Sequence, residues 1–326
     1  MSPKAGQALI ESLKLLRPEI AGHLAEIEQN LDAEAPQGLI GEKLGFEKDA
    51  VGTLLDFAGI DRDVIEGWRP ASGASAPSVP FLAGLPSTHV IEDQQIIHDY
   101  SHFPGMDGTD ADKVGWRVYT RGDDSPSHHQ LFVYNANRTR IEEATGVDLL
   151  YYNEPSHSLV MVQYKRMREE GSSWTYRLDH NMHKELERMR DVDEACQKMD
   201  QSSDPRLIAT PCMVKLCRTT PFAMNSSALI PGMYLTREHF EDALQSKDAV
   251  GPRGGIRINE ESIPRHLNNT MFSTLVKDGW IGSRETGTNY LIEVIQQCLS
   301  PQGVGAVVVG VHRSPVPRGN RRTRHF

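Results

Sequence analysis

The stretch GVDLLYYNEPSHSLVMVQYKRM, residues 146–167, decides the fold of the middle of this chain. Two very apolar runs flank the polar residues EPSH, a connection short enough for an antiparallel β-hairpin. Charged and amide side chains rarely stand on strands this apolar without a partner or a task. The hairpin nevertheless contains Asp148, Gln163 and Lys165, whose presence calls for an explanation.

The alternation of side chains along a strand predicts how these three residues are arranged. A period of two puts Gln163 and Lys165 on one face of the second strand and Tyr164 on the other. An antiparallel hairpin brings the start of its first strand beside the end of its second strand. We therefore expect Asp148 to lie across from Gln163 and Lys165, within reach of a shared ion.

A short helix predicted directly before the hairpin ends at a glycine and adds two acids, Glu142 and Glu143. A hard divalent cation such as Mg²⁺ or Mn²⁺ needs oxygen ligands, which Asp148, one helix glutamate and the carbonyl of Gln163 can supply. Such a cation lowers the pKa of a bound water and neutralises charge on a scissile phosphate. Lys165 can then orient or deprotonate that water.

The residues and their order resemble the restriction-endonuclease-like, PD-(D/E)xK nuclease superfamily, and within it the Mrr-like restriction enzymes and archaeal-type Holliday junction resolvases. Those proteins carry Gly-x-Asp at the start of one strand and (Glu/Gln)-x-Lys at the end of the next. The resemblance spans residues 131–216 and implies metal-binding roles for Asp148, Gln163 and Glu143 or Glu142, with Lys165 as the catalytic lysine. No Pro precedes Asp148, and Gln replaces the usual acid at 163, so the helix glutamate becomes more necessary.

The rest of the chain is predicted to divide around this hairpin. The expected fold is α/β, a restriction-endonuclease-like mixed sheet flanked by helices, preceded by a helical region. The predicted segments are a helical N-terminal region (1–70), a Pro-, Ser- and Gly-rich linker (71–87), the nuclease-like core (88–250), a C-terminal α/β extension (251–312) and a basic tail (313–326).

Composition excludes several classes of protein. With 326 residues, 38% hydrophobic and 24% charged, the chain has ordinary globular composition and lacks an apolar run long enough to span a bilayer. The amphipathic N-terminus lacks signal-peptide features, which predicts a cytoplasmic protein without membrane contact. Four sparse cysteines favour buried thiols over a disulfide framework or a zinc site. The net charge of −9 argues against a basic surface throughout but allows a local basic groove.

DNA is the expected substrate, with RNA as an alternative, and the resemblance suggests a role in restriction or phage defence. Predicted phosphate contacts come from the end of the hairpin and from the tail: Arg166, Arg168, Arg318, Arg321 and Arg322. The N-terminal helices are expected to bind a second copy of the chain or a partner protein.

Three alternatives remain open on the sequence. Asp148 and Lys165 can form a buried ion pair across the hairpin, with no catalytic task. The chain can be a catalytically inactive nuclease-fold protein that binds nucleic acid or a partner. It can also be a purely structural subunit of an assembly.

Overall fold

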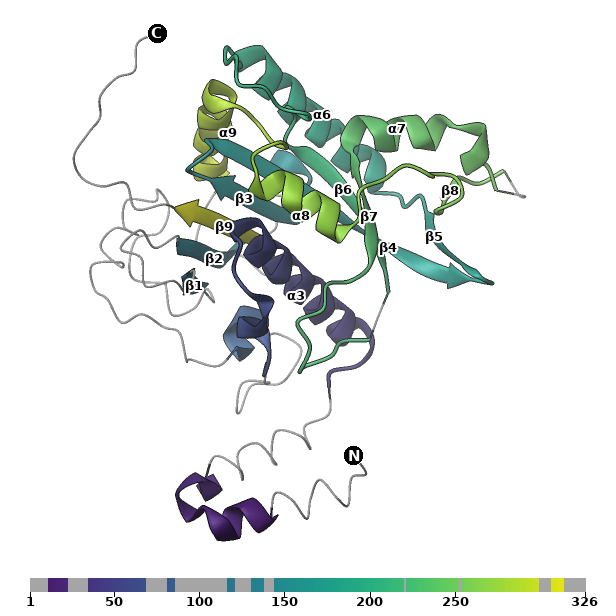
Figure 1. Cartoon of the computed structure of the whole chain (residues 1–326). Coiled ribbons are helices and arrows are strands. Elements are labelled where there is room, and N and C mark those ends of the chain that lie inside the picture. Colours follow the sequence, from purple (N-terminus) through teal and green to yellow (C-terminus); the bar gives the residue numbers. More distant parts are fainter. Residues whose placement is uncertain are drawn as a thin grey trace, which may run out of the picture.

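The structure is a computed structural model of the chain (Figure 1). It describes residues 11–22, 35–68, 81–85, 116–120, 130–137, 144–219, 221–251, 254–298 and 306–313. Glu142 and Glu143, and the tail with Arg318, Arg321 and Arg322, lie outside these residues.

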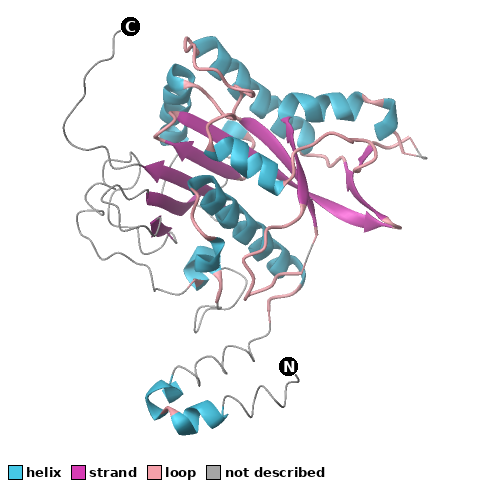
Figure 2. Ribbon diagram, in the orientation of Figure 1, coloured by secondary structure: helices cyan, strands magenta, loops and turns pink. Residues whose placement is uncertain are grey.

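A mixed β-sheet organises the described residues (Figure 2). Its nine described strands are β1 (Trp116–Thr120), β2 (Gln130–Asn137), β3 (Leu149–Asn153), β4 (Ser158–Glu170), β5 (Ser173–Arg177), β6 (Cys212–Arg218), β7 (Gly232–Thr236), β8 (Arg257–Ile258) and β9 (Ala306–Arg313). Most of the sheet runs in the order β1-β2-β9-β3-β4-β6-β7, and only the pairs β3–β9 and β4–β6 are parallel. The far end of β4 pairs instead with β5, which pairs with β8.

Helices cover both faces of the sheet (Figure 1). We call these faces the α3 face and the α6 face. The α3 face carries α3 (Gly38–Ala58) and α8 (Asn269–Lys277), and the α6 face carries α6 (Met182–Met199), α7 (Arg237–Gln245) and α9 (Glu285–Cys298). The short 3-10 helices are η1 (Pro18–Ile20), η2 (Arg62–Ile65), η4 (Phe81–Gly84) and η5 (Lys247–Ala249).

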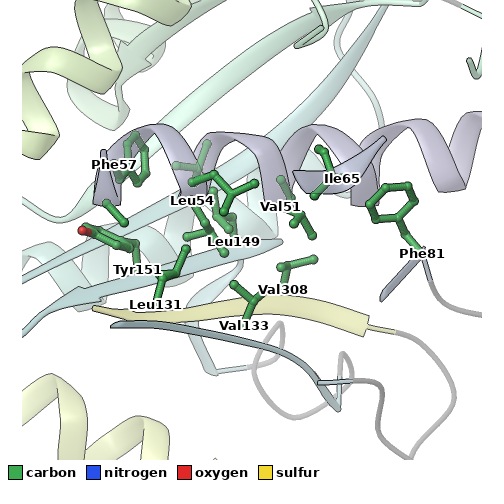
Figure 3. Close-up of a cluster of buried hydrophobic side chains, with 14 of the residues drawn as sticks. Val51, Leu54, Phe57, Ile65, Phe81, Leu131, Val133, Leu149, Tyr151 and Val308 are labelled. Atoms are coloured by element: carbon green, nitrogen blue, oxygen red, sulfur yellow. The ribbon is translucent and has the colours of Figure 1, made fainter. Parts of the chain in front are cut away.

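The apolar run of β4 feeds both cores, which explains why it reads as continuous rather than alternating. Val160 and Val162 are buried among residues of the α3 face, whereas Leu159 and Met161 are buried on the α6 face. Figure 3 shows the first of these cores, where α3 lies along β2, β9 and β3. Its labelled side chains are Val51, Leu54, Phe57, Ile65, Phe81, Leu131, Val133, Leu149, Tyr151 and Val308.

The α/β class and the local elements agree with the sequence prediction. The hairpin, the long helix after it and the apolar C-terminal strand all form. The prediction for the N-terminal region needs revision, because α3 forms part of the core instead of a separate helical unit. Part of the predicted linker is also buried: Phe81 is fully enclosed, its N–H donates to Glu47 and its carbonyl accepts from Trp68 Nε1.

The C-terminal segment is likewise no separate extension. Strand β9 lies between β2 and β3, antiparallel to the first and parallel to the second. Residues 306–313 therefore complete the same sheet that holds the hairpin, although more than 130 residues separate them from β4.

Candidate functional site

The hairpin presents two of the three polar residues as the alternation predicts. Gln163 and Lys165 lie on the α6 face of β4, and Tyr164 lies on the α3 face. The alternation is broken at Asp148: its N–H donates at 3.0 Å to the carbonyl of Val162, the partner of Leu149, and Val147 and Leu149 are buried on opposite faces of the sheet. The expected place of Asp148 across from Gln163 and Lys165 is therefore wrong, because the chain bends as it enters β3.

Backbone contacts hold Asp148 in place between two strands. Its Oδ2 accepts a hydrogen bond from Tyr164 N–H at 3.0 Å, and its carbonyl accepts from Val308 N–H at 3.0 Å. The residue is only partly buried, at the point where the chain enters β3. The carboxylate is therefore oriented by β4, while β9 holds the backbone of the same residue.

Gln163 has an unusual hydrogen-bonding state for a buried amide. Its side chain is 2% exposed, and its Nε2 makes one long bond of 3.4 Å to the Tyr164 carbonyl. Its Oε1 is buried and has no hydrogen-bond partner among the described residues. A buried acceptor without a hydrogen bond lowers the stability of the fold by about 1–3 kcal/mol. A hydrogen-bond donor or a cation bound at this oxygen would recover that free energy.

Lys165 is buried, with 8% of its surface exposed, and its ammonium contacts two carboxylates at the start of α6. One is Glu185, which is itself buried, and the other is Asp179, whose Oδ2 lies 3.2 Å from Lys165 Nζ. Lys165 is therefore not simply the partner of Asp148 in a two-residue ion pair.

Asp179 is fixed by further bonds. Its Oδ1 accepts from the N–H groups of Asn181 and Met182 at the first turn of α6, and its Oδ2 accepts from Tyr176 OH at 3.0 Å. Partial burial opposes ionisation of this carboxyl, but Lys165 and these bonds together hold its pKa below its usual value. The lowered pKa favours the charged form of Asp179, which is the form that pairs with Lys165.

Gly146 allows α6 to come close to the hairpin. Gly146 lies just before the first strand of the hairpin, and its φ of +70° lies in the left-handed region that favours glycine. A Cβ on Gly146 would lie 2.7 Å from the backbone oxygen of Glu185 and 3.1 Å from its Cα. The missing side chain therefore lets the backbone of Glu185 approach the start of the hairpin closely.

The predicted basic contacts lie elsewhere. Arg166 forms an ion pair with Glu42 of α3, and Arg168 is exposed; both belong to the side of β4 opposite Lys165. His180 and His183 are exposed at the start of α6, near the lysine.

Metal binding by acids, histidines and cysteines alone is not supported. Within the described ranges, no three such side chains are grouped so that they could hold an ion. Cys212 and Cys217 belong to cores on opposite faces of the sheet, so they cannot share a zinc ion. An oxygen site that includes the amide of Gln163 does fit the donors present, because its unpartnered Oε1 is a neutral ligand of the kind hard cations accept.

Comparisons with known proteins add no relative. The chain matches no protein-family model, no curated protein and no solved structure. No helix in the described part of the chain is long and apolar enough to cross a membrane. A functional assignment therefore depends on the geometry of this chain's own residues.

Glu185 and Asp179 were not predicted from the sequence. One signal for Glu185 was present, because it occupies the apolar stripe of α6 between Met182 and Met189, both fully buried. An acid on such a stripe needs a partner in the core. That partner lies on β4, and helix periodicity by itself cannot identify it.

Proposed function

We propose that the protein is a metal-dependent nuclease that hydrolyses phosphodiester bonds, with DNA as the favoured substrate, on a restriction-endonuclease-like core. The observation that carries the proposal is the buried amide oxygen of Gln163, which has no partner among the described residues and lies beside the buried Lys165 on the α6 face of β4. The Asp148 carboxylate stands at the entry to the neighbouring strand, where it accepts a bond from Tyr164 N–H. A role in restriction or phage defence rests on the sequence resemblance.

Each residue has a chemical task in this proposal. Asp148 and Gln163 Oε1 would hold Mg²⁺ or Mn²⁺, which supplies a more acidic water and neutralises charge on the phosphate. Lys165 orients the attacking water and offsets the charge that develops on the phosphate oxygens. The buried position of Lys165 strengthens this electrostatic effect, since few water molecules screen its charge.

Cleavage assays test the assignment. Supercoiled plasmid, single-stranded DNA and RNA are incubated with Mg²⁺ or Mn²⁺ and with wild type, Lys165→Ala or the control Lys198→Ala, an exposed lysine at the far end of α6. We expect divalent-dependent cleavage by wild type and Lys198→Ala, and a rate lower by about 100-fold or more in Lys165→Ala. Equal cleavage by wild type and Lys165→Ala would overturn the proposal.

One observation favours a second candidate, a catalytically inactive protein of the same fold that binds nucleic acid or a partner. Lys165 already has two carboxylate neighbours, as a lysine with a purely structural role would. This alternative predicts binding without cleavage that Asp148→Ala leaves unchanged. A second copy or a partner protein would bind at the N-terminal helix, where Leu15 and Leu16 are exposed.

A further inference from the structure

A short apolar segment, residues 81–85, lies in the core of the α3 face, although the sequence around it is rich in Pro, Ser and Gly. Phe81 and Leu82 are fully buried, and Leu85 is 6% exposed. A proline stands directly before the segment and another directly after it. Because proline donates no backbone hydrogen bond and disfavours a helical residue before it, this sequence does not favour a longer helix or strand. The segment therefore depends on contacts with other elements to stay in the core.

Two side chains from other elements bind the backbone of Phe81. Its N–H donates to Glu47 Oε2 of α3 at 2.6 Å, and its carbonyl accepts from Trp68 Nε1 at 2.9 Å. Glu47 and Trp68 are themselves buried, so both bonds are shielded from water. A hydrogen bond to a carboxylate is also stronger than one between two neutral groups. Neither bond involves a residue next to Phe81 in the chain.

Aromatic rings enclose the side chain of Phe81, which lies beside α3 in Figure 3. Its ring is stacked on that of Trp68, with the centroids 6.4 Å apart, and stands edge to face with Phe222 at 6.3 Å. Trp68 and Phe222 also contact each other edge to face, at 5.2 Å. We call the residues Glu47, Trp68 and Phe222 the Phe81 pocket.

The 81–85 segment is bound in the way a separate peptide is bound. A connecting loop usually runs over the surface of a protein. Here three apolar side chains and two backbone bonds, all within five residues, attach the segment to the core of the α3 face. Recognition of short peptides likewise combines main-chain hydrogen bonds, which give affinity, with pockets for side chains, which give specificity.

We propose that the Phe81 pocket is a peptide-binding site and that the 81–85 segment occupies it as a ligand in cis. The ligand class is a short apolar peptide of the pattern Phe-Leu-x-x-Leu, in which Phe enters the pocket. The covalent connection gives the segment a high effective concentration at the pocket, so it excludes a separate peptide of the same sequence. This inference is independent of the proposed function, because Gln163 and Lys165 lie on the opposite face of the sheet.

Cutting the full chain on both sides of the segment tests the proposal. Recognition sites for a specific protease are inserted after positions 78 and 87, outside the described residues. After cleavage, we expect the released peptide to co-elute with the folded chain in gel filtration. Loss of the peptide from a chain that stays folded by circular dichroism would overturn the proposal. Unfolding on cleavage would overturn it too, because the segment would then be an inseparable part of the core.

Exchange with a labelled peptide measures the pocket directly. The probe is the fluorescein-labelled peptide VPFLAGLP, residues 79–86, followed by fluorescence anisotropy. After removal of the excised peptide by dilution, we expect the probe to bind the cut chain at least about tenfold more tightly than the uncut chain. The same peptide with Phe81→Ala should bind the cut chain at least about tenfold more weakly. Equal binding of either pair would contradict the proposal.

Two tryptophan variants separate recognition of the backbone from general stability. Trp68→Phe keeps an aromatic ring but removes the N–H that binds the Phe81 carbonyl, so we expect the cut chain to bind the probe about three- to tenfold more weakly. The matched control is Trp174→Phe on β5, which should bind as the unmodified cut chain does. An unchanged affinity in Trp68→Phe would remove the indole bond as a determinant of recognition and overturn the proposed binding mode.

Discussion

Two buried lysines on neighbouring strands of this sheet have opposite surroundings. Lys165 on β4 pairs in register with Leu216 on β6, and Tyr164 pairs with Lys215. The two lysines are therefore one register position apart, yet they point to opposite faces. They allow an internal comparison between a charge buried in a closed ion pair and a charge buried in the cluster of the proposed site.

Lys215 forms a closed ion pair on the α3 face. Its side chain and that of Asp49 are both fully buried and in direct contact, and Asp49 Oδ1 also accepts from Ile230 N–H at 2.6 Å. The ammonium lies 5.3 Å from the ring centroid of Tyr164 and 5.0 Å from that of Tyr234. Burial disfavours its charge, but Asp49 raises the pKa of Lys215 above its usual value. This pair links α3 to the sheet.

Lys165 belongs to an open and incompletely satisfied cluster. It shares two carboxylates, of which Asp179 has a side chain 43% exposed, and it stands beside Gln163 with its unpartnered Oε1. Folding alone does not account for this arrangement, because an apolar residue at 163 would avoid the cost of the buried acceptor. A buried charged side chain alone therefore does not identify a candidate site, since Lys215 has one too. The unsatisfied hydrogen-bond acceptor beside Lys165 is what distinguishes the candidate site.

The largest expected loss of stability comes from breaking the Lys215–Asp49 ion pair. Lys215→Met leaves Asp49 buried and unpaired, so we expect the free energy of unfolding to fall by about 3–5 kcal/mol. Lys165→Met should cost only about 1–2 kcal/mol, because Asp179 retains access to water. Urea denaturation of the three proteins measures both values. Equal losses at the two positions would contradict the distinction between the lysines.

The close approach at Gly146 provides a second test. Gly146→Ala combines a left-handed backbone with a Cβ placed against Glu185, so we expect a loss of about 2–4 kcal/mol and a displaced α6. Gly171→Ala is the matched control, since Gly171 has a φ of +65° with nothing within 4 Å of the added carbon. It should cost about 1 kcal/mol. Thermal and urea unfolding of both variants compare the costs, and similar values would argue against a tight contact.

The variant Gln163→Met is expected to change stability and cleavage activity in opposite directions. Replacing the amide with an apolar side chain of similar length removes the buried acceptor without a partner, so we expect stability to rise by about 1 kcal/mol. If the proposed function holds, cleavage falls in the same variant, because the oxygen proposed to bind the cation is lost. Denaturation and plasmid cleavage are measured on one preparation. A destabilised but fully active variant would show that Gln163 serves packing instead.

The smallest expected effect is on how the stability of the fold depends on pH. The folded-state pKa of Asp179 lies below its unfolded value, so its ionisation stabilises the fold above that unfolded value. The contribution disappears as pH falls through the folded pKa, in the region below about pH 4. Thermal unfolding at pH 7 and pH 3 should therefore show a smaller acid loss in Asp179→Asn than in wild type. If Asp179→Asn and wild type lost the same stability between pH 7 and pH 3, the ionised Asp179 carboxylate would not stabilise the fold.

Local periodicity was enough to predict the hairpin and the faces that Gln163, Tyr164 and Lys165 take on β4. Side-chain alternation and a four-residue turn are properties of adjacent residues, and both appear in β4 and in its connection to β3. The place of Asp148 was predicted wrongly, because its N–H bonds the Val162 carbonyl and the alternation breaks there. The insertion of β9 between β2 and β3 was not predictable, because strand order depends on pairings between distant segments. Residues 142 and 143, predicted as the helix acid, lie outside the described residues, so that choice remains a prediction.

The sequence by itself determined the hairpin and the face of β4 on which Gln163 and Lys165 lie. Only the tertiary structure decided what meets them there. In the folded chain α3 and Phe81 are buried in the core, and Asp49 forms an ion pair with Lys215. The backbone of Glu185 packs against Gly146, and its side chain forms an ion pair with Lys165. The physical reason is that a strand's alternation is set by its own backbone, whereas the partner of a buried charge is set by the packing of a whole helix against the sheet.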